Sequence, residues 1–125
     1  MTIRRMDNVG IVVEDMDAAI AFFVELGMEP EGRAEVGGVV ADQCTGLDGV
    51  HCGIATLQTP DRHSRLELAK YYSPAAISAE PRERPHNVLG THRVMFAVDD
   101  IEDSYRLCYV RGPEGIIVGL AEQLN

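Results

Sequence analysis

The sequence contains no tryptophan, few cysteines and no long apolar run. Its three cysteines are odd in number and form no CxxC pair, which excludes a disulfide framework and a zinc knuckle. We interpret Cys44, Cys52 and Cys108 as reduced, structural residues. No apolar stretch approaches the length of a membrane span, and the N-terminal MTIRRMDN lacks the apolar region of a signal peptide. We therefore expect a cytoplasmic protein with no membrane partner.

Basic residues are also scarce. The 125 residues include 11 lysines and arginines against 20 acidic residues, a net charge of -9, and the basic residues form no cluster. Nucleic acid is therefore excluded as a partner. Hydrophobic residues at 46% and charged residues at 25% are ordinary values for a folded chain, and the length suits one domain, residues 1–125.

The chain repeats one pattern. MDNVGIVVEDMD near the N-terminus aligns with THRVMFAVDDIE some way along the chain, so that Val9 matches Val94 and Asp15 matches Asp100. The first copy is followed by AAIAFFVELG, whose apolar spacing predicts a helix, while DSYRLCYVRGPEG follows the second copy. The repeat predicts two related modules.

The first module, about residues 4–71, is predicted as βαβββ. A strand at Val9–Val13 leads to a helix that Asp15 caps and Gly27 ends. The turn-rich stretches GRAEVGG and TGLDG frame a weak strand at about residues 39–44. Strands over residues 50–57 and 65–71 then form a hairpin around TPDRHS.

A proline-rich linker over about residues 72–90 precedes the second module, about residues 91–125. That module has strands at residues 93–98, SYRLCYV and IIVGLAE, but it lacks the helix and second strand of the first. Either the deletion is real and a partner chain covers the bare strand, or the protein has a helix that this sequence omits. We favour the second explanation, with the seam between Asp100 and Ser104.

The doubled βαβββ plan, MDNVGIVVED running into AAIAFFVELG, and RGPEGIIVGL in place of a DPDGN turn and its strand together resemble the vicinal oxygen chelate superfamily. That superfamily includes glyoxalase I, extradiol dioxygenases, methylmalonyl-CoA epimerase and bleomycin resistance proteins. The resemblance implies an α+β fold in which two modules form an open barrel around a cavity for a small molecule. It also implies a homodimer.

Strand alternation predicts which side chains face that cavity. Val9, Ile11 and Val13 suit packing beneath a helix, as do Val94, Phe96 and Val98 in the repeat. The residues between them should then face inward. The inward set, with its counterparts on the other strands, is Asn8, Gly10, Val12, His51, Gly53, Ala55, Arg65, Glu67, Ala69, Arg93, Met95, Ala97, Tyr105, Leu107, Tyr109, Ile117, Gly119 and Ala121.

The resemblance also implies four metal-ligand positions, often two histidines and two glutamates. In this sequence they are Asn8, Glu67, Arg93 and Gly119, of which only Glu67 is a good ligand. Arg93 brings a permanent positive charge that repels a cation. We expect no metal and no other cofactor. The alternative is a divalent metal at a relocated site formed by His51 and Glu67.

Arg93 leaves two interpretations open. It forms an ion pair with Glu67 that fills the vacant metal site, or it binds the carboxylate or enolate oxygen of a ligand, with Glu67 as base and Tyr105 or Tyr109 as donors. The leading function is metal-independent binding of a small apolar or anionic molecule, as in the glyoxalase and bleomycin-resistance type. The alternative is a lyase, isomerase or dioxygenase that uses the relocated metal or Glu67.

Overall fold

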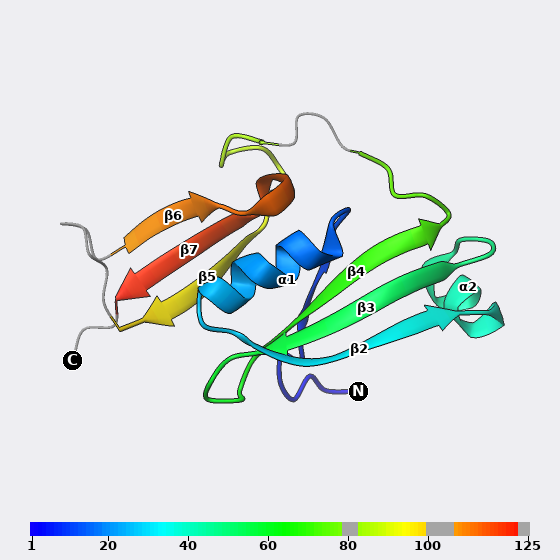
Figure 1. The fold of residues 1–125 in the computed structure, drawn as a ribbon, viewed down its shortest axis with the longest axis horizontal. Coiled ribbons are helices and arrows are strands. Elements are labelled where there is room, and N and C mark those ends of the chain that lie inside the picture. The colour runs from blue at the N-terminus through cyan, green and yellow to red at the C-terminus, as the bar shows by residue number, and fades with distance from the viewer. Residues whose placement is uncertain (79–82, 100–106, 123–125) are drawn as a thin grey trace. The chain divides into compact units, whose positions relative to one another are not determined.

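The structure, a computed structural model, describes residues 1–78, 83–99 and 107–122. It contains two compact units, Met1–Ile77 and Ser78–Asn125, each built on its own sheet (Figure 1). None of the described helices is long and apolar enough to cross a membrane. The α+β fold class is confirmed, and the open barrel formed by both modules stays a prediction.

The first unit is a four-stranded sheet with strand order β1-β4-β3-β2. Its strands are β1 (Val9–Val12), β2 (Glu29–Gly37), β3 (His51–Gln58) and β4 (Arg65–Ser73). β1 runs parallel to β4, whereas the β4–β3 and β3–β2 pairs are antiparallel. The predicted hairpin between residues 50–57 and 65–71 is therefore confirmed.

Helix α1 (Met16–Glu25) covers one face of this sheet, as predicted. The Asp15 carboxylate accepts a hydrogen bond from the Ala18 amide at 3.0 Å and so caps the helix. Phe23 of the helix and Leu68 of β4 are fully buried. Burial of each such side chain contributes about 1.5–3 kcal/mol, which holds the helix on the sheet.

Two predictions for the first unit are wrong. Residues 39–44 are not a strand but belong to helix α2 (Val39–Thr45), and the turn-rich GRAEVGG stretch lies in the nine-residue strand β2. The Asp42 carboxylate accepts from the Gly49 and Val50 amides and ties the end of α2 to the next strand. Pairing with β3 outweighs the weak strand propensity of Gly32 and Pro30, and the register shifts between these two residues.

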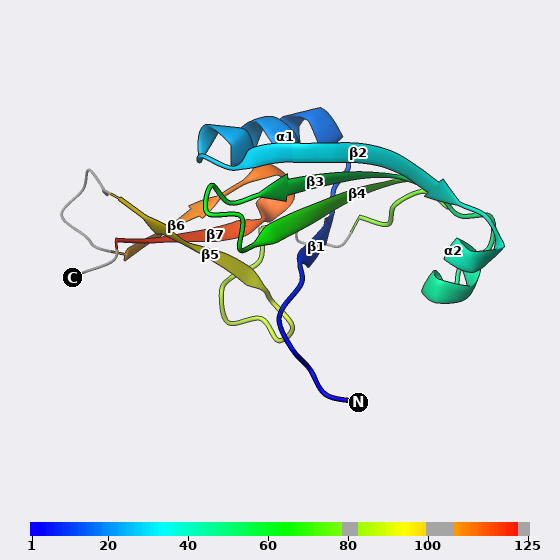
Figure 2. The same ribbon diagram turned by 90° about the horizontal axis from the view of Figure 1, so that it is seen from below.

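The two helices lie on opposite faces of the sheet (Figure 2). α2 places Ala41 against Val50 and Cys52, with Ile54 and Tyr71 packed beside them. α1 packs against β3 and β4 on the other face. β3 is therefore apolar on both faces.

The second unit is a three-stranded sheet with order β5-β7-β6. Its strands are β5 (Arg93–Val98), β6 (Leu107–Arg111) and β7 (Ile117–Glu122), and the short 3-10 helix η1 (Pro113–Gly115) joins the last two. Residues 99–106 between β5 and β6 are too few for counterparts of the ten-residue α1 and nine-residue β2. The predicted seam between Asp100 and Ser104 lies outside the described residues.

Candidate functional site

The two modules repeat the same strand register. Val9 lies opposite Leu66 in the β1–β4 pair, and its sequence repeat Val94 lies opposite Val118 in the β5–β7 pair. One step further along, Gly10 lies opposite Glu67, and Met95 lies opposite Gly119. The ligand positions implied by the resemblance therefore occupy equivalent places in the two sheets.

The first candidate surface is the sheet face of the first unit that carries Glu67, here called the Glu67 face. Glu67 lies between Gly10 of β1 and Thr56 of β3. Because Gly10 has no side chain, the β1 residue directly opposite Glu67 adds no side chain to this face. Asn8 precedes β1, is exposed, and donates to the Asp7 carboxylate at 3.4 Å.

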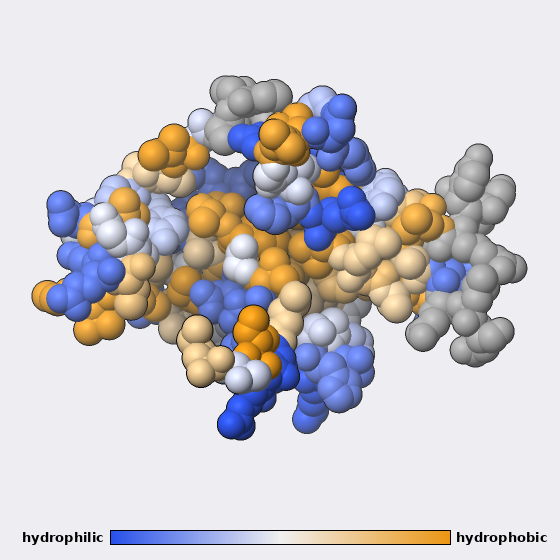
Figure 3. Space-filling model, turned by 180° about the vertical axis from the view of Figure 1, so that it is seen from behind, coloured by the Kyte–Doolittle hydropathy of each residue, from blue (hydrophilic) through white to orange (hydrophobic). Residues whose placement is uncertain are grey.

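The burial of β1 and β4 supports the predicted orientation of these strands. Val13 is 1% exposed and Leu68 is 0% exposed on the helix side, whereas Val12 on the Glu67 face is 56% exposed. Viewed from the side away from α1, the molecule shows apolar side chains among polar ones (Figure 3). The Glu67 face itself carries the exposed apolar side chain of Val12.

An ion pair lies near Glu67 on the same unit. Arg65 donates to Glu31 through Nε at 2.9 Å and through Nη2 at 3.3 Å. The Glu31 carboxylate raises the pKa of Arg65, first by its hydrogen bonds and then by its charge. Arg65 and Glu31 both belong to the first unit, so this guanidinium is paired there.

The predicted orientation of β3 is wrong. Ala55 and Leu57 are buried and lie opposite Leu68 and Leu66, so they face α1. Cys52 and Ile54, predicted for the helix side, lie on the Glu67 face with α2. The error arises because both faces of this strand are apolar, so alternation alone cannot distinguish them.

The structure therefore does not bring His51 to Glu67. His51 lies opposite Ser73, while Glu67 lies opposite Thr56, and the register shifts between His51 and Cys52. The His51 ring is 5.0 Å from the Tyr72 ring, and its Nε2 is 3.4 Å from Glu35 Oε2. The relocated His51–Glu67 metal site is contradicted by this register. Within the described residues, no group of three or more histidine, cysteine or acidic side chains could hold a metal.

The second candidate surface is one face of the three-stranded sheet of the second unit, here called the arginine face. Its register forms three rows across the strands: Arg93–Ile117–Arg111, Met95–Gly119–Tyr109 and Ala97–Ala121–Leu107. This grouping confirms that the described residues predicted for the inward side of these three strands share one face. Tyr105 lies outside the described residues.

Gly119 is the most crowded point of the arginine face. A Cβ at this residue would lie 2.1 Å from Met95 Sδ and 3.1 Å from Tyr109 Cε1. Met95 and Tyr109 therefore fill the space where a ligand side chain would stand. The donor set at the four positions, with glycine here and arginine at residue 93, does not fit a divalent metal.

Cationic and aromatic groups surround this point. The Arg93 guanidinium carbon is 5.7 Å from the centre of the Tyr109 ring, within the range of a cation–π contact. The His86 ring meets the same Tyr109 ring edge-on at 5.0 Å. Arg111 donates to the Gly115 carbonyl at 3.3 Å and to the Arg84 carbonyl. The strand residues of this face include two arginines and no carboxylate.

A sequence profile of the Glyoxalase/Bleomycin resistance protein/Dioxygenase superfamily matches residues 5–114. The chain belongs to this superfamily. A crystal structure of a glyoxalase family protein from Bacillus cereus is 46% identical, with a TM-score of 0.89, and the match covers 100% of this chain and 97% of that chain.

The crystal structure of SMU.1112c, at 20% identity and a TM-score of 0.60, shares the fold, with coverage of 97% of this chain and 100% of that one. A search among curated proteins gives no significant match.

Proposed function

We propose that this superfamily member binds a small anionic molecule with an apolar or aromatic body, without a metal ion, and thereby sequesters or senses it. The observation that carries the proposal is the arrangement of the arginine face. Met95 and Tyr109 fill the space beside Gly119, and Arg93 lies over the Tyr109 ring. Apolar contact area and an accessible cation thus occur together where the superfamily holds its metal.

The net charge of the chain bears on where an anionic ligand can bind. The protein carries a net charge of -9, so an anion is repelled by most of its surface. Arg93 and Arg111 flank Ile117 on adjacent strands, about 10 Å apart at the usual strand spacing. A carboxylate held by Arg93, with its apolar body on Met95 and Tyr109, fits this spacing and sign.

The test is a thermal-shift screen of small aromatic and aliphatic acids, followed by calorimetric titration of each hit. Arg93→Ala is expected to weaken binding at least about tenfold, because it removes a charge-assisted hydrogen bond. Arg4→Ala, which removes the same charge from an exposed N-terminal residue, is the control and should bind normally. Unchanged affinity with a lower melting temperature in Arg93→Ala would show that Arg93 stabilises the fold and does not bind the ligand.

A second candidate function is catalysis with Glu67 as general base. The observation that favours it is Gly10, the residue opposite Glu67, which places no side chain beside it on β1. A compound that binds would then be consumed, and Glu67→Gln would stop its conversion while leaving its affinity within a few fold. If no bound compound is converted, as followed by NMR, the catalytic candidate fails.

A further inference from the structure

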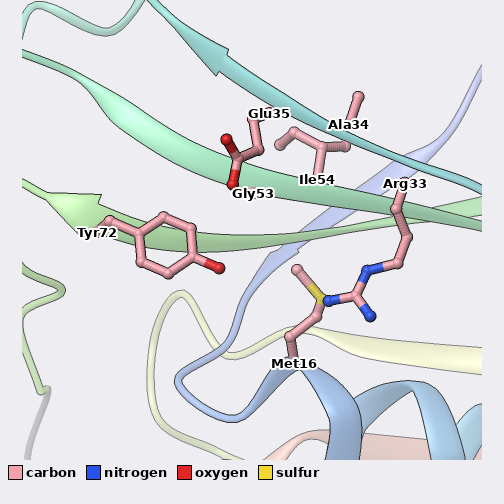
Figure 4. Close-up of a pocket in the computed structure, with 7 residues that line it drawn as sticks. All are labelled: Met16, Arg33, Ala34, Glu35, Gly53, Ile54 and Tyr72. Atoms are coloured by element: carbon pink, nitrogen blue, oxygen red, sulfur yellow. The ribbon is translucent and has the colours of Figure 1, made fainter.

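A separate cavity lies on the other face of the first sheet, beyond the start of α1. Strands β2, β3 and β4 extend past the N-terminal end of this helix, so this part of the face is not covered by it (Figure 1). The cavity has a volume of about 440 Å³. It is here called the Tyr72 pocket and is lined by Met16, Arg33, Glu35, Gly53 and Tyr72, with Ala34 and Ile54 at its floor (Figure 4).

Register separates this pocket from the Glu67 face. Glu35 lies opposite Gly53, and Arg33 lies opposite Ala55, a buried residue of the α1 side. Glu67 and Thr56 face the other way. The Tyr72 pocket is therefore independent of the site proposed above, and all of its lining residues belong to the first unit.

One wall of the pocket is an aromatic surface. The Tyr72 ring lies over Gly53, where an added Cβ would be 3.4 Å from Tyr72 Cε2. The His51 ring is tilted by 32° against it, and Lys70 Nζ is 5.8 Å from its centre. Tyr72 is still 50% exposed, so ring surface is available to a ligand.

The other walls carry one charge of each sign. Arg33 and Glu35 are two residues apart on the same face of β2, about 7 Å along the strand. Their partners are exposed and weak: Arg33 Nη1 is 3.2 Å from Asp17, and Glu35 is 3.4 Å from His51. Ion pairs of this kind contribute little to stability, so a ligand can replace them at low cost.

We propose that the Tyr72 pocket binds a small zwitterion with a flat aromatic body, in the manner of an aromatic amino acid. Arg33 receives the carboxylate, Glu35 receives the ammonium group, and the ring lies on Tyr72. Met16 closes the end beside α1 with an adaptable thioether. The pocket presents a cation, an anion and an aromatic surface together, and this ligand class satisfies all three.

The experiment titrates phenylalanine, tyrosine and tryptophan by calorimetry into the full-length protein and into full-length Arg93→Ala. The comparison with trimmed compounds is made in the variant, because the intact arginine face is itself proposed to bind aromatic acids. Phenethylamine, phenylpropionate and alanine each lack one of the three recognised groups. At least one aromatic amino acid is expected to bind about tenfold more tightly than any of these three compounds. No binding of any aromatic amino acid at millimolar concentration would overturn the proposal, as would equal binding of the trimmed compounds.

Variants of the pocket residues then test whether the amino acid binds in the Tyr72 pocket. Tyr72→Leu and Arg33→Gln are each expected to weaken binding about tenfold. Arg93→Ala should leave it unchanged, which makes failure here distinguishable from failure of the anion site. Circular dichroism and melting temperature without ligand check that each variant is folded. Binding that is lost in Arg93→Ala, or retained in both pocket variants, would contradict the assignment.

Discussion

Met95 lies directly opposite Gly119, and its sulfur occupies the space that any side chain at residue 119 would need. The equivalent pair in the first module is reversed, with glycine on the first strand at Gly10 and a large residue on the last strand at Glu67. Only the second pair is crowded, because a Cβ at Gly10 would lie 3.9 Å from its nearest atom. The second module fills its position with a thioether from β5 in place of a carboxylate from β7.

This crowding predicts the effect of a single methyl group. Gly119→Ala places a Cβ against Met95 Sδ, the movable end of a side chain that is 46% exposed, and should lower the free energy of unfolding by about 1 kcal/mol, measured by urea denaturation. Gly10→Ala is the matched control, because its Cβ would lie 3.9 Å from the nearest atom, the Glu67 carbonyl oxygen. Addition of Met95→Ala to Gly119→Ala should recover part of the loss. If Gly119→Ala is as stable as Gly10→Ala, the crowding is not present in solution.

The residues at the four metal-ligand positions, Asn8, Glu67, Arg93 and Gly119, predict that added metal ions do not stabilise the protein. Zinc, manganese, iron(II) and nickel at millimolar concentration should raise the melting temperature by no more than a degree, since ligands that bind only the folded state stabilise it. Dialysis against a chelator should likewise leave ligand binding unchanged. Stoichiometric metal in the purified protein, measured by elemental analysis, would contradict this prediction.

The hydrogen bonds accepted by the Asp42 carboxylate predict that this residue stabilises the connection between α2 and β3. Its carboxylate accepts from the Gly49 amide at 3.1 Å and from the Val50 amide at 2.8 Å. Asp42→Ala should reduce the free energy of unfolding by about 1.5–3 kcal/mol, because both amides lose a charged acceptor. Asp48→Ala, in the same loop, serves as the control. Equal stability of the two variants would show that Asp42 does not hold this loop.

The hydrogen bonds accepted by the Asp61 carboxylate predict that the stability of the β3–β4 turn depends on pH. Its pKa lies below the usual 3.8, first because the Thr59 hydroxyl donates to the carboxylate and then because the His63 amide does. A lowered folded-state pKa means that the ionised form stabilises the turn above the unfolded pKa, and that this contribution is lost as the pH falls through the folded pKa. NMR titration should find the low pKa, and Thr59→Val should raise it. An Asp61 pKa that is the same in the variant would rule out the hydroxyl as the cause.

The sequence by itself determined the elements whose signals are local. Asp15 and the apolar spacing after it set the start and buried face of α1, because capping and helical periodicity act within a few residues. The run RVMFAV gave the bounds of β5, and alternation along it placed Arg93 and Met95 on the face that also carries Gly119. The repeat itself predicted two related modules.

Tertiary structure alone decided the features that depend on distant partners. β2 contains glycine and proline and forms a strand because β3 supplies its hydrogen bonds, while residues 39–45 form a helix whose end is tied by Asp42 to later amides. His51 lies away from Glu67 because the β3–β4 register pairs it with Ser73 and pairs Glu67 with Thr56. The sequence could not show this, because α1 and α2 cover opposite faces of β3 and both faces are apolar. Alternation gives the period of such a strand, and only the packed helices decide which side is which.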